Sequence, residues 1–582
     1  LTALLCVMAA SCGGGGDAKT TTVPSSTTAE DAETETVTAT ADTEPASSGN
    51  ATSQLRETYF ADGDFKDVSG ETPNAQITLS GNTGTISDTT RGSSGSTVTV
   101  TSKGIYRVTG AGTDVTIEVA DTAESGNVYL IFDGVTMANS SSPCVLVSNA
   151  DKTVITCVGE NTLSFDGGGE YDGAIYAKDD LTINGTGSLS ITSGEHGVVC
   201  KNDLRITGAV LNVASGSIGL KANDSVCFGG GETTVAAGHD GVQVDSDDGD
   251  CYFYIDSGSL TVTAGYDGVD VGGSNDGFIS LIYIVSGAVD ISAGGGSSHS
   301  KSDTSQKGLR SEQIIVIDGG EVTISSADDS INSSDEIVVT GGELTLATSD
   351  DGIHADGHIA ISGGSIDILK SYEGIEGYEV TITGGDISVF ASDDGISCSG
   401  GSDTTSTETM PWMWSQGDSS AILSIKGGSI YVNAEGDGLD SNGSIYVSGG
   451  TTIVEGPSSP GNGAIDKGDG ASCVCEITGG TVLAIGKSDM AVNFSSGTQC
   501  SALVSLSGAA GTEISVGDGS GFTYTATKSF DCIVYSSPFI ESGSTCTISA
   551  GGASETADFS SSMFYSSVSS MGMGGPGGMM RP

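Results

Sequence analysis

Residues 341–362, GGELTLATSDDGIHADGHIAIS, and residues 363–384, GGSIDILKSYEGIEGYEVTITG, are two copies of one 22-residue unit that decides the fold. Each copy holds a Gly-Gly turn, a short alternating strand, an acidic corner and a second alternating strand. A fixed period of this length is typical of a solenoid. The corner recurs four times in succession, at Asp328-Asp329-Ser330-Ile331, Asp350-Asp351-Gly352-Ile353, Tyr372-Glu373-Gly374-Ile375 and Asp393-Asp394-Gly395-Ile396.

The segments between corners and turns have the pattern of short β-strands. Leu344-Thr345-Leu346 and Ile366-Asp367-Ile368 alternate, and no stretch of the unit repeats its apolar residues at helical spacing. The glycine pairs supply backbone with positive φ at little steric cost. We therefore predict an all-β protein, a parallel β-helix of about a dozen coils. Two polar inserts, at about 294–304 and at 399–420, lengthen single coils of this helix.

The flanking regions depart from the period. Residues 56–140 and 500–557 are strand-rich but do not keep the 22-residue period. We therefore expect an N-terminal and a C-terminal β cap on the β-helix of residues 141–499. Residues 13–55 are rich in Thr, Ser and Glu and predict a disordered stalk. Residues 558–582 predict a disordered Gly/Met-rich tail.

Residues 1–12 have the pattern of a lipoprotein signal peptide. Leu1 to Ala10 are apolar but too few to span a membrane, and Ala9-Ala10-Ser11-Cys12 resembles a bacterial lipoprotein processing site. Cys12 would then be lipidated, which predicts an extracellular protein that contacts the membrane only through this anchor. An ordinary secretory signal with a chance cysteine is the alternative.

The net charge is strongly negative. The formal charge of −55 argues against nucleic acid or anionic lipid as a charge-driven partner. A chain this acidic either stays soluble by repulsion, for which we expect a monomer, or collects cations.

The acidic corners predict a calcium site. Equivalent residues of successive coils stack about 4.8 Å apart, where like carboxylates repel by roughly 3–4 kcal/mol at an effective dielectric of 20. A cation between the columns relieves this repulsion, and flexible oxygen-rich sites suit Ca²⁺. The alternative is that these aspartates only cap turns through backbone hydrogen bonds. The predicted ligands are Asp240, Asp267, Asp270, Asp328, Asp329, Asp350, Asp351, Glu373, Glu376, Asp393, Asp394, Asp437 and Asp440.

Three aromatic residues are candidates for sugar stacking. Trp412 and Trp414 lie in the 399–420 insert, and Tyr372 precedes an acidic corner. Aromatic faces suit stacking on a sugar ring. The tryptophans could instead cover the side of the solenoid, and Tyr372 could be surface packing.

No residue set predicts catalysis. The chain has no nucleophile elbow, phosphate loop or HExxH motif, and nothing singles out one pair among its many carboxylates. His354 and His358 fall in a corner and a strand, so we expect surface residues and not a metal pair.

The chain resembles a known family. The runs Ile105-Tyr106-Arg107-Val108-Thr109-Gly110, Val128-Tyr129-Leu130-Ile131-Phe132-Asp133-Gly134-Val135 and Glu160-Asn161-Thr162-Leu163 precede the repeated Asp-Gly-Ile coils. Together they resemble the bacterial secreted carbohydrate-binding domain-containing β-helix proteins, of which a clostridial cellulose- and pectin-binding protein is the type. The resemblance covers about residues 75–490. It implies a right-handed helix with bound calcium, affinity for cellulose or acidic plant polysaccharides, and no established catalysis.

Three functions follow as hypotheses. The first is a surface-tethered, calcium-containing, non-catalytic polysaccharide-binding protein. The second is a calcium-dependent pectate-type lyase, which needs a base; Arg310, Lys307 and Lys370 are the basic residues near acidic corners. The third is an adhesin or structural surface protein.

Overall fold

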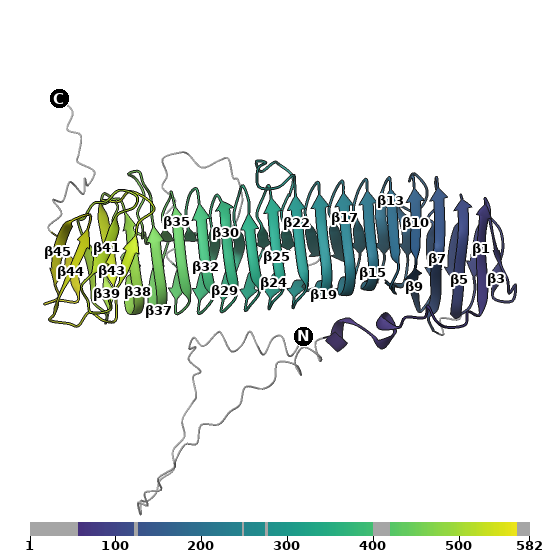
Figure 1. The fold of residues 1–582 in the computed structure, drawn as a ribbon, viewed down its shortest axis with the longest axis horizontal. Coiled ribbons are helices and arrows are strands. Elements are labelled where there is room, and N and C mark those ends of the chain that lie inside the picture. The colour runs from purple at the N-terminus through teal and green to yellow at the C-terminus, as the bar shows by residue number, and fades with distance from the viewer. Residues whose placement is uncertain (1–55, 122–125, 247–248, 274–277, 400–419, 567–582) are drawn as a thin grey trace, which may run out of the picture. The chain divides into compact units, whose positions relative to one another are not determined.

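The computed structural model describes residues 56–121, 126–246, 249–273, 278–399 and 420–566. These residues lie in the second of two compact units, Leu1–Thr52 and Ser53–Pro582. Successive coils pair in parallel through about 13 turns, which confirms the predicted β-helix (Figure 1). Among the described residues, no helix is long and apolar enough to cross a membrane.

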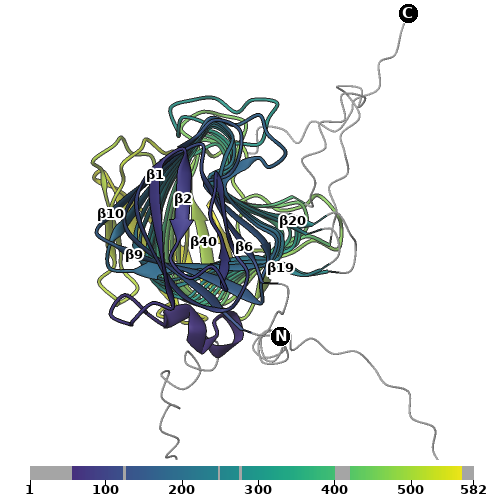
Figure 2. The same ribbon diagram turned by 90° about the vertical axis from the view of Figure 1, so that its right-hand side faces the viewer.

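The coils wrap one continuous sheet into three faces, called A, B and C here (Figure 2). Face A contains β10 (Glu160–Phe165), β13 (Ser188–Ser193), β22 (Ala288–Ala293), β25 (Glu321–Ser326), β28 (Glu343–Ala347), β30 (Ser365–Ser371), β32 (Asp386–Ala391) and β35 (Ser429–Ala434). Face B contains β1 (Ala75–Gly81), β5 (Gly104–Thr113), β9 (Lys152–Val158), β12 (Asp180–Gly185), β21 (Ser280–Ile284), β24 (Ile314–Ile317), β27 (Glu336–Val339), β34 (Ile422–Ile425) and β39 (Ser496–Gly497).

Face C contains β4 (Thr97–Val100), β6 (Thr116–Ala120), β8 (Val145–Asn149), β11 (Gly173–Ala177), β14 (His196–Cys200), β16 (Leu220–Ala222), β18 (Val242–Ser246), β20 (Val269–Gly273), β23 (Leu309–Ser311), β26 (Ile331–Ser333), β33 (Ile396–Cys398) and β36 (Leu439–Ser441). Long strands bend from one face to the next. From B to A these are β7 (Val128–Asn139), β15 (Asp203–Ser215), β17 (Ser225–Ala237), β19 (Cys251–Ala264), β37 (Ser444–Glu455) and β38 (Cys475–Gly486), and from C to B they are β29 (Ile353–Ile361) and β31 (Ile375–Ile382).

The core is a set of stacked aliphatic columns. On face C, the register pairs Ile331 with Ile353, Ile353 with Ile375 and Ile375 with Ile396, and all four side chains are buried. The corner glycines permit this stacking for a reason that the sequence did not indicate. A Cβ on Gly352 would lie 2.6 Å from the Gly374 carbonyl oxygen and 2.8 Å from Ile368. The Gly-Gly turns do need positive φ, which is +96° at Gly342.

The ends of the helix differ from each other. Parallel pairing begins at β1, where Ala75 pairs with Tyr106, so residues 75–140 are coils and the predicted N-terminal cap over 56–140 is corrected. These coils do not keep the 22-residue period, because Tyr106 pairs with Leu130 and Leu130 pairs with Ile155. The coils are therefore 24 and 25 residues long. Two short strands, β2 (Thr83–Ile86) and β3 (Gly92–Ser93), form antiparallel pairs beside the first coil.

The C-terminal end is closed by antiparallel strands. β43 (Cys532–Ser536) pairs antiparallel with β38 and with β40 (Ser501–Val504), and β46 (Met563–Tyr565) pairs with β40. A four-stranded sheet is formed there by β41 (Glu513–Val516), β42 (Thr523–Thr525), β44 (Thr545–Ala550) and β45 (Ala553–Asp558). It shares a second apolar core with β38, β40 and β43. The antiparallel pairing of β43 with β38 and β40 covers the edge at which parallel pairing of the coils stops.

Residues 56–69, with the 3-10 helix η1 (Asp62–Phe65), cross the outside of face B as a strap (Figure 2). The ring of Tyr59 stacks on that of Tyr254, with 4.0 Å between centroids. The buried carboxylate of Asp64 accepts hydrogen bonds from Lys152 Nζ at 2.7 Å and from Thr182 Oγ1 at 2.6 Å. The eleven cysteines of the described part of the chain are buried and unpaired.

Candidate functional site

The acidic corners form a ridge between faces A and C, where the strand register stacks one residue of each coil in a column. The column lies two positions before the paired aliphatic residues of face C. Its members from Asp240 onward are Asp240, Asp267, Lys307, Asp329, Asp351, Glu373, Asp394 and Asp437.

One oxygen of most of these carboxylates caps the next coil. The backbone N–H of Asp351 donates to Asp329 Oδ1 at 3.1 Å, and that of Glu373 donates to Asp351 Oδ1 at 3.2 Å. Asp437 N–H donates to Asp394 Oδ1 at 2.6 Å. The turn-capping alternative therefore accounts for one oxygen of each of these aspartates, while the second oxygen remains available to other groups.

In the middle of the ridge, side-chain cations neutralise the carboxylates. Lys307 Nζ lies 2.5 Å from Asp329 Oδ2 and 3.1 Å from Asp328 Oδ1, and Lys301 Nζ lies 2.5 Å from Asp350 Oδ2. Burial alone would lower the pKa of Lys307, but Asp329 and Asp328 raise it. We call Asp328, Asp329, Asp350 and Asp351 with Lys301, Lys307 and His354 the middle corner.

His354 lies inside the middle corner, contrary to the expected surface position. It is 4% exposed, and its Nδ1 lies 3.1 Å from both Asp351 Oδ2 and Glu376 Oε2. Burial disfavours the imidazolium, but hydrogen bonds to these carboxylates raise the pKa of His354 well above its usual value. His358, in contrast, is exposed. The interior position of His354 follows from the register, which pairs it with Glu376 in the next coil.

Farther along, the carboxylates have no such partners. We call Glu373, Asp394, Asp437, Asp440 and Asp466 the downstream acid cluster; within the described part of the chain, none of them forms an ion pair with Lys, Arg or His. Lys467, which follows Asp466, directs its ammonium to the Gly468 carbonyl at 2.9 Å.

Burial, followed by the neighbouring carboxylates, raises the pKa of these acids. The pKa rises to about 9 for Glu373, about 8 for Asp440, about 7 for Asp437 and about 6 for Asp394. Carboxylate oxygens of Asp437, Asp440 and Asp466 lie within 4.8 Å of one another. Glu373 Oε2 is buried and makes no hydrogen bond to any residue that the structure describes. The oxygen-only donor set of Asp437, Asp440 and Asp466 fits Ca²⁺.

The remaining predicted ligands fall elsewhere. Asp270 binds Arg310 Nη1 at 2.5 Å, and Asp240 contacts His239 Nδ1 at 3.0 Å. Burial and then Asp270 raise the pKa of Asp267 to about 7. Asp393 and Asp350 lie in the neighbouring column, where Tyr372 stands between them. Glu376 forms an ion pair with His354. Sequence reasoning missed Asp466, although it occupies the position after Ile465, which bridges to Leu439.

Aromatic side chains lie at this ridge, where Tyr372 follows β30, and on the adjoining face A, where Phe390 belongs to β32 and Tyr431 to β35. Tyr372 is 48% exposed, Phe390 is 41% exposed, and the Phe390 and Tyr431 rings contact edge-on with 5.7 Å between centroids. We call Tyr372, Phe390 and Tyr431 the aromatic strip. Phe390 and Tyr431 were missed, although alternation in β32 and β35 directs both outward. Trp412, Trp414 and Cys12 lie outside the described residues.

Comparison with known proteins identifies related sequences. A carbohydrate-binding domain-containing protein of Acetivibrio thermocellus is 30% identical over 127 residues, which cover 20% of this chain and 44% of the relative. The chain thus spans less than half the length of that relative. A solved structure described as a polysaccharide lyase-like protein from C. thermocellum, gadolinium derivative, is 28% identical with a TM-score of 0.35, covering 38% of this chain and 92% of the other.

The match to a family is the broadest of these findings. Residues 94–352 match the family described as carbohydrate-binding domain-containing protein, which confirms over this range the family resemblance predicted from the sequence.

Proposed function

We propose that the chain is a non-catalytic polysaccharide-binding protein that uses calcium and is tethered to the cell surface through Cys12. One observation carries the proposal: the exposed aromatic strip borders a cluster of carboxylates that lacks any cationic partner among the described residues. Tyr372 and Glu373 are adjacent in the chain, and Phe390 and Asp394 belong to the next coil.

The aromatic strip supplies the sugar contact. Tyr372, Phe390 and Tyr431 come from three successive coils. Phe390 pairs with Asn433 and Tyr431 pairs with Ser388, so the three rings run diagonally across the coils. Aromatic faces bind the apolar side of a sugar ring, and a row of them suits a linear glycan such as cellulose or polygalacturonate.

Calcium is the cation that we propose for the downstream acid cluster. Asp437, Asp440 and Asp466 would hold it, and Glu373 and Asp394 would add negative charge from the preceding coils. When bound, the ion supplies positive charge that offsets the carboxylates of the protein and attracts those of an acidic glycan. An acidic protein can then bind an acidic polysaccharide.

The basic residues near the corners do not suit the lyase hypothesis. Neighbouring carboxylates, against the effect of burial, raise the pKa of both Arg310 and Lys307, so both stay protonated. Lys370 contacts Ser297 and Ser349 at the surface. A proton-abstracting base needs a lowered pKa.

The test is retention of the 582-residue chain on cellulose and on polygalacturonate, with Ca²⁺ or with EDTA, while the same samples are assayed for unsaturated uronate. We expect calcium-dependent retention on polygalacturonate without product. Product formation would show a lyase, and failure to bind either polymer would contradict the proposal in favour of adhesion.

Two variants assign the binding to the site. Phe390→Ala with Tyr431→Ala removes two rings, each worth about 0.5–1.5 kcal/mol, so we expect about tenfold weaker binding. The matched control is Phe278→Ala, which removes an exposed phenylalanine outside the strip. Equal losses in both variants would exclude the aromatic strip as the sugar contact.

A further inference from the structure

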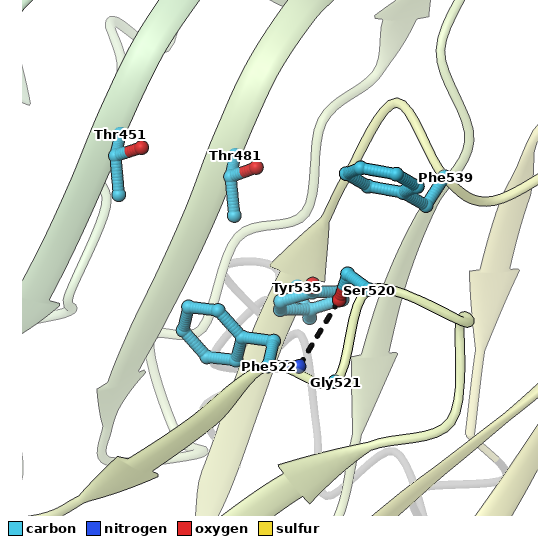
Figure 3. A pocket seen from close by; sticks show the side chains of 7 residues that line it. All are labelled: Thr451, Thr481, Ser520, Gly521, Phe522, Tyr535 and Phe539. Atoms are coloured by element: carbon cyan, nitrogen blue, oxygen red, sulfur yellow. Dashed lines mark hydrogen bonds between the residues drawn. The ribbon is translucent and has the colours of Figure 1, made fainter.

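A separate cavity lies where the last coils meet the C-terminal sheet. Its volume is about 220 Å³, and its walls include Thr451 of β37, Thr481 of β38 and, from the C-terminal region, Phe522, Tyr535 and Phe539 (Figure 3). Cavities for drug-sized ligands measure about 300–1,000 Å³. This volume therefore suits a single sugar ring and not a longer oligosaccharide.

Aromatic rings form one side of the cavity. The half-buried ring of Phe522 packs on the fully buried ring of Tyr535, with 5.4 Å between centroids, and Phe539 stands at the rim with 59% of its surface exposed. Tyr535 is held from behind, because its hydroxyl donates to Asp518 Oδ2 at 2.8 Å.

Hydroxyl groups form the other side. The register pairs Thr451 with Thr481, and Figure 3 shows both hydroxyl oxygens directed toward the side where Phe539 and Tyr535 lie. Within the described part of the chain, neither hydroxyl makes a hydrogen bond. The nearby Ser520 hydroxyl is already occupied, since it bonds Asp518 and accepts from Phe522 N–H at 3.1 Å.

From these contacts we infer that the cavity binds one neutral pyranose ring, with its apolar face on the aromatic side and its hydroxyls toward Thr451 and Thr481. Among the residues that the structure describes, no charged side chain lines the cavity, which disfavours a uronate. The inference rests on the proposed polysaccharide binding, but its residues share no position with the aromatic strip or the downstream acid cluster. It adds a site for a chain end or a side branch of the glycan.

The test is saturation-transfer NMR of the intact chain with the methyl glycosides of glucose, galactose, mannose and xylose. We expect transfer to at least one neutral glycoside and none to methyl galacturonide. Phe539→Ala should weaken the binding at least tenfold. Thr451→Val with Thr481→Val should weaken it similarly without changing the shape of the cavity.

The Phe390→Ala, Tyr431→Ala variant separates this inference from the proposed function. It should lose retention on the polymer yet bind the methyl glycoside as the wild type does. Binding of a glycoside that Phe539→Ala removes would support the cavity even if the wild type binds no polymer. The inference is overturned if no neutral glycoside shows transfer, or if both cavity variants bind as the wild type does.

Discussion

The middle corner and the downstream acid cluster occupy the same ridge and have nearly the same backbone, yet they balance their charge differently. In the middle corner, Lys307, Lys301 and His354 contact the carboxylates directly. In the downstream acid cluster, Glu373, Asp394 and Asp437 stack without such contacts within the described residues.

The difference shows that stacked acids alone do not indicate a metal. Asp329 is fully buried beside Lys307, so the cost of burying its charge is offset by a neighbouring side chain. Glu373 has an unsatisfied buried oxygen and a pKa raised to about 9 by burial and then by Glu376 and Asp351. We propose an added cation only for the region where the protein supplies no cationic side chain.

The largest effect should come from Lys307→Met. This change leaves Asp329 buried without its ammonium partner, while Asp328 keeps the contact with Lys301 at 3.4 Å. Breaking a buried ion pair in this way costs about 3–5 kcal/mol. Urea unfolding, with hydrogen exchange to localise the loss to coils 300–355, measures it. Lys370→Met, which removes an exposed lysine from a surface contact, should cost under about 1 kcal/mol.

The same variant tests whether charge balance is what distinguishes the middle corner from the downstream acid cluster. If charge balance alone separates the two regions, Ca²⁺ should partly restore Lys307→Met, because Asp328, Asp329 and Asp350 have oxygens within 4.8 Å of one another. A variant as stable as the wild type, or one that Ca²⁺ does not improve, would contradict this account.

Calcium should stabilise the wild-type chain through its downstream coils. At a hundredfold excess over its Kd, a ligand that binds only the folded state adds about 2.7 kcal/mol. Hydrogen exchange with Ca²⁺ and with EDTA should show the added protection at residues 373–466 and little at 300–355. Asp437→Asn with Asp440→Asn should abolish it, while Asp290→Asn, on face A, should not. Uniform protection would refute the distinction between the two regions.

Without calcium, stability should fall as the pH rises. The folded pKa of Glu373 is about 9 and that of Asp440 about 8, both above the ordinary value near 4. Between pH 5 and 9 the folded state therefore holds protons that the unfolded state releases, so raising the pH favours unfolding. One pKa unit is worth about 1.4 kcal/mol. After allowance for solvent screening, we expect a loss of about 2 kcal/mol, measured by thermal melts in EDTA.

The fold was predictable because its information is periodic. The 22-residue spacing of Asp351, Glu373 and their glycines indicates the coil, and alternation in β28 and β30 indicates which side chains face inward. The strap of residues 56–69 has no period. Its contacts, such as Tyr59 on Tyr254 and Asp64 on Lys152, join segments far apart in the chain, which no local pattern reveals.

For the candidate site, the sequence predicted the stacking of the acidic residues in a column but not the side chains that contact them. Stacking of Asp329, Asp351 and Glu373 follows from the spacing, but their partners do not. Lys307 follows Asp267 in the column after 40 residues, because an insert lengthens its coil, and this hid the cation inside the acidic series. The role of His354 depends on the side to which its ring turns, and that is a property of packing.

Glu373→Gln and Glu376→Gln test the boundary between the middle corner and the downstream acid cluster. We expect the smallest effects from these two variants. At pH 8 the folded state must keep a proton on Glu373 that the unfolded state releases, because burial and the neighbouring carboxylates disfavour the charge. Glu373→Gln removes this cost, so in EDTA at pH 8 it should stabilise the chain by about 1 kcal/mol and flatten the pH dependence. Glu376→Gln should do the opposite, because Glu376 has a lowered pKa owing to His354, despite the opposing effect of burial. Thermal melts of the two variants decide the point. Glu373 and Glu376 are only three residues apart, and both are predicted calcium ligands. If the two variants change the stability in the same direction, His354 does not mark the boundary between the two regions.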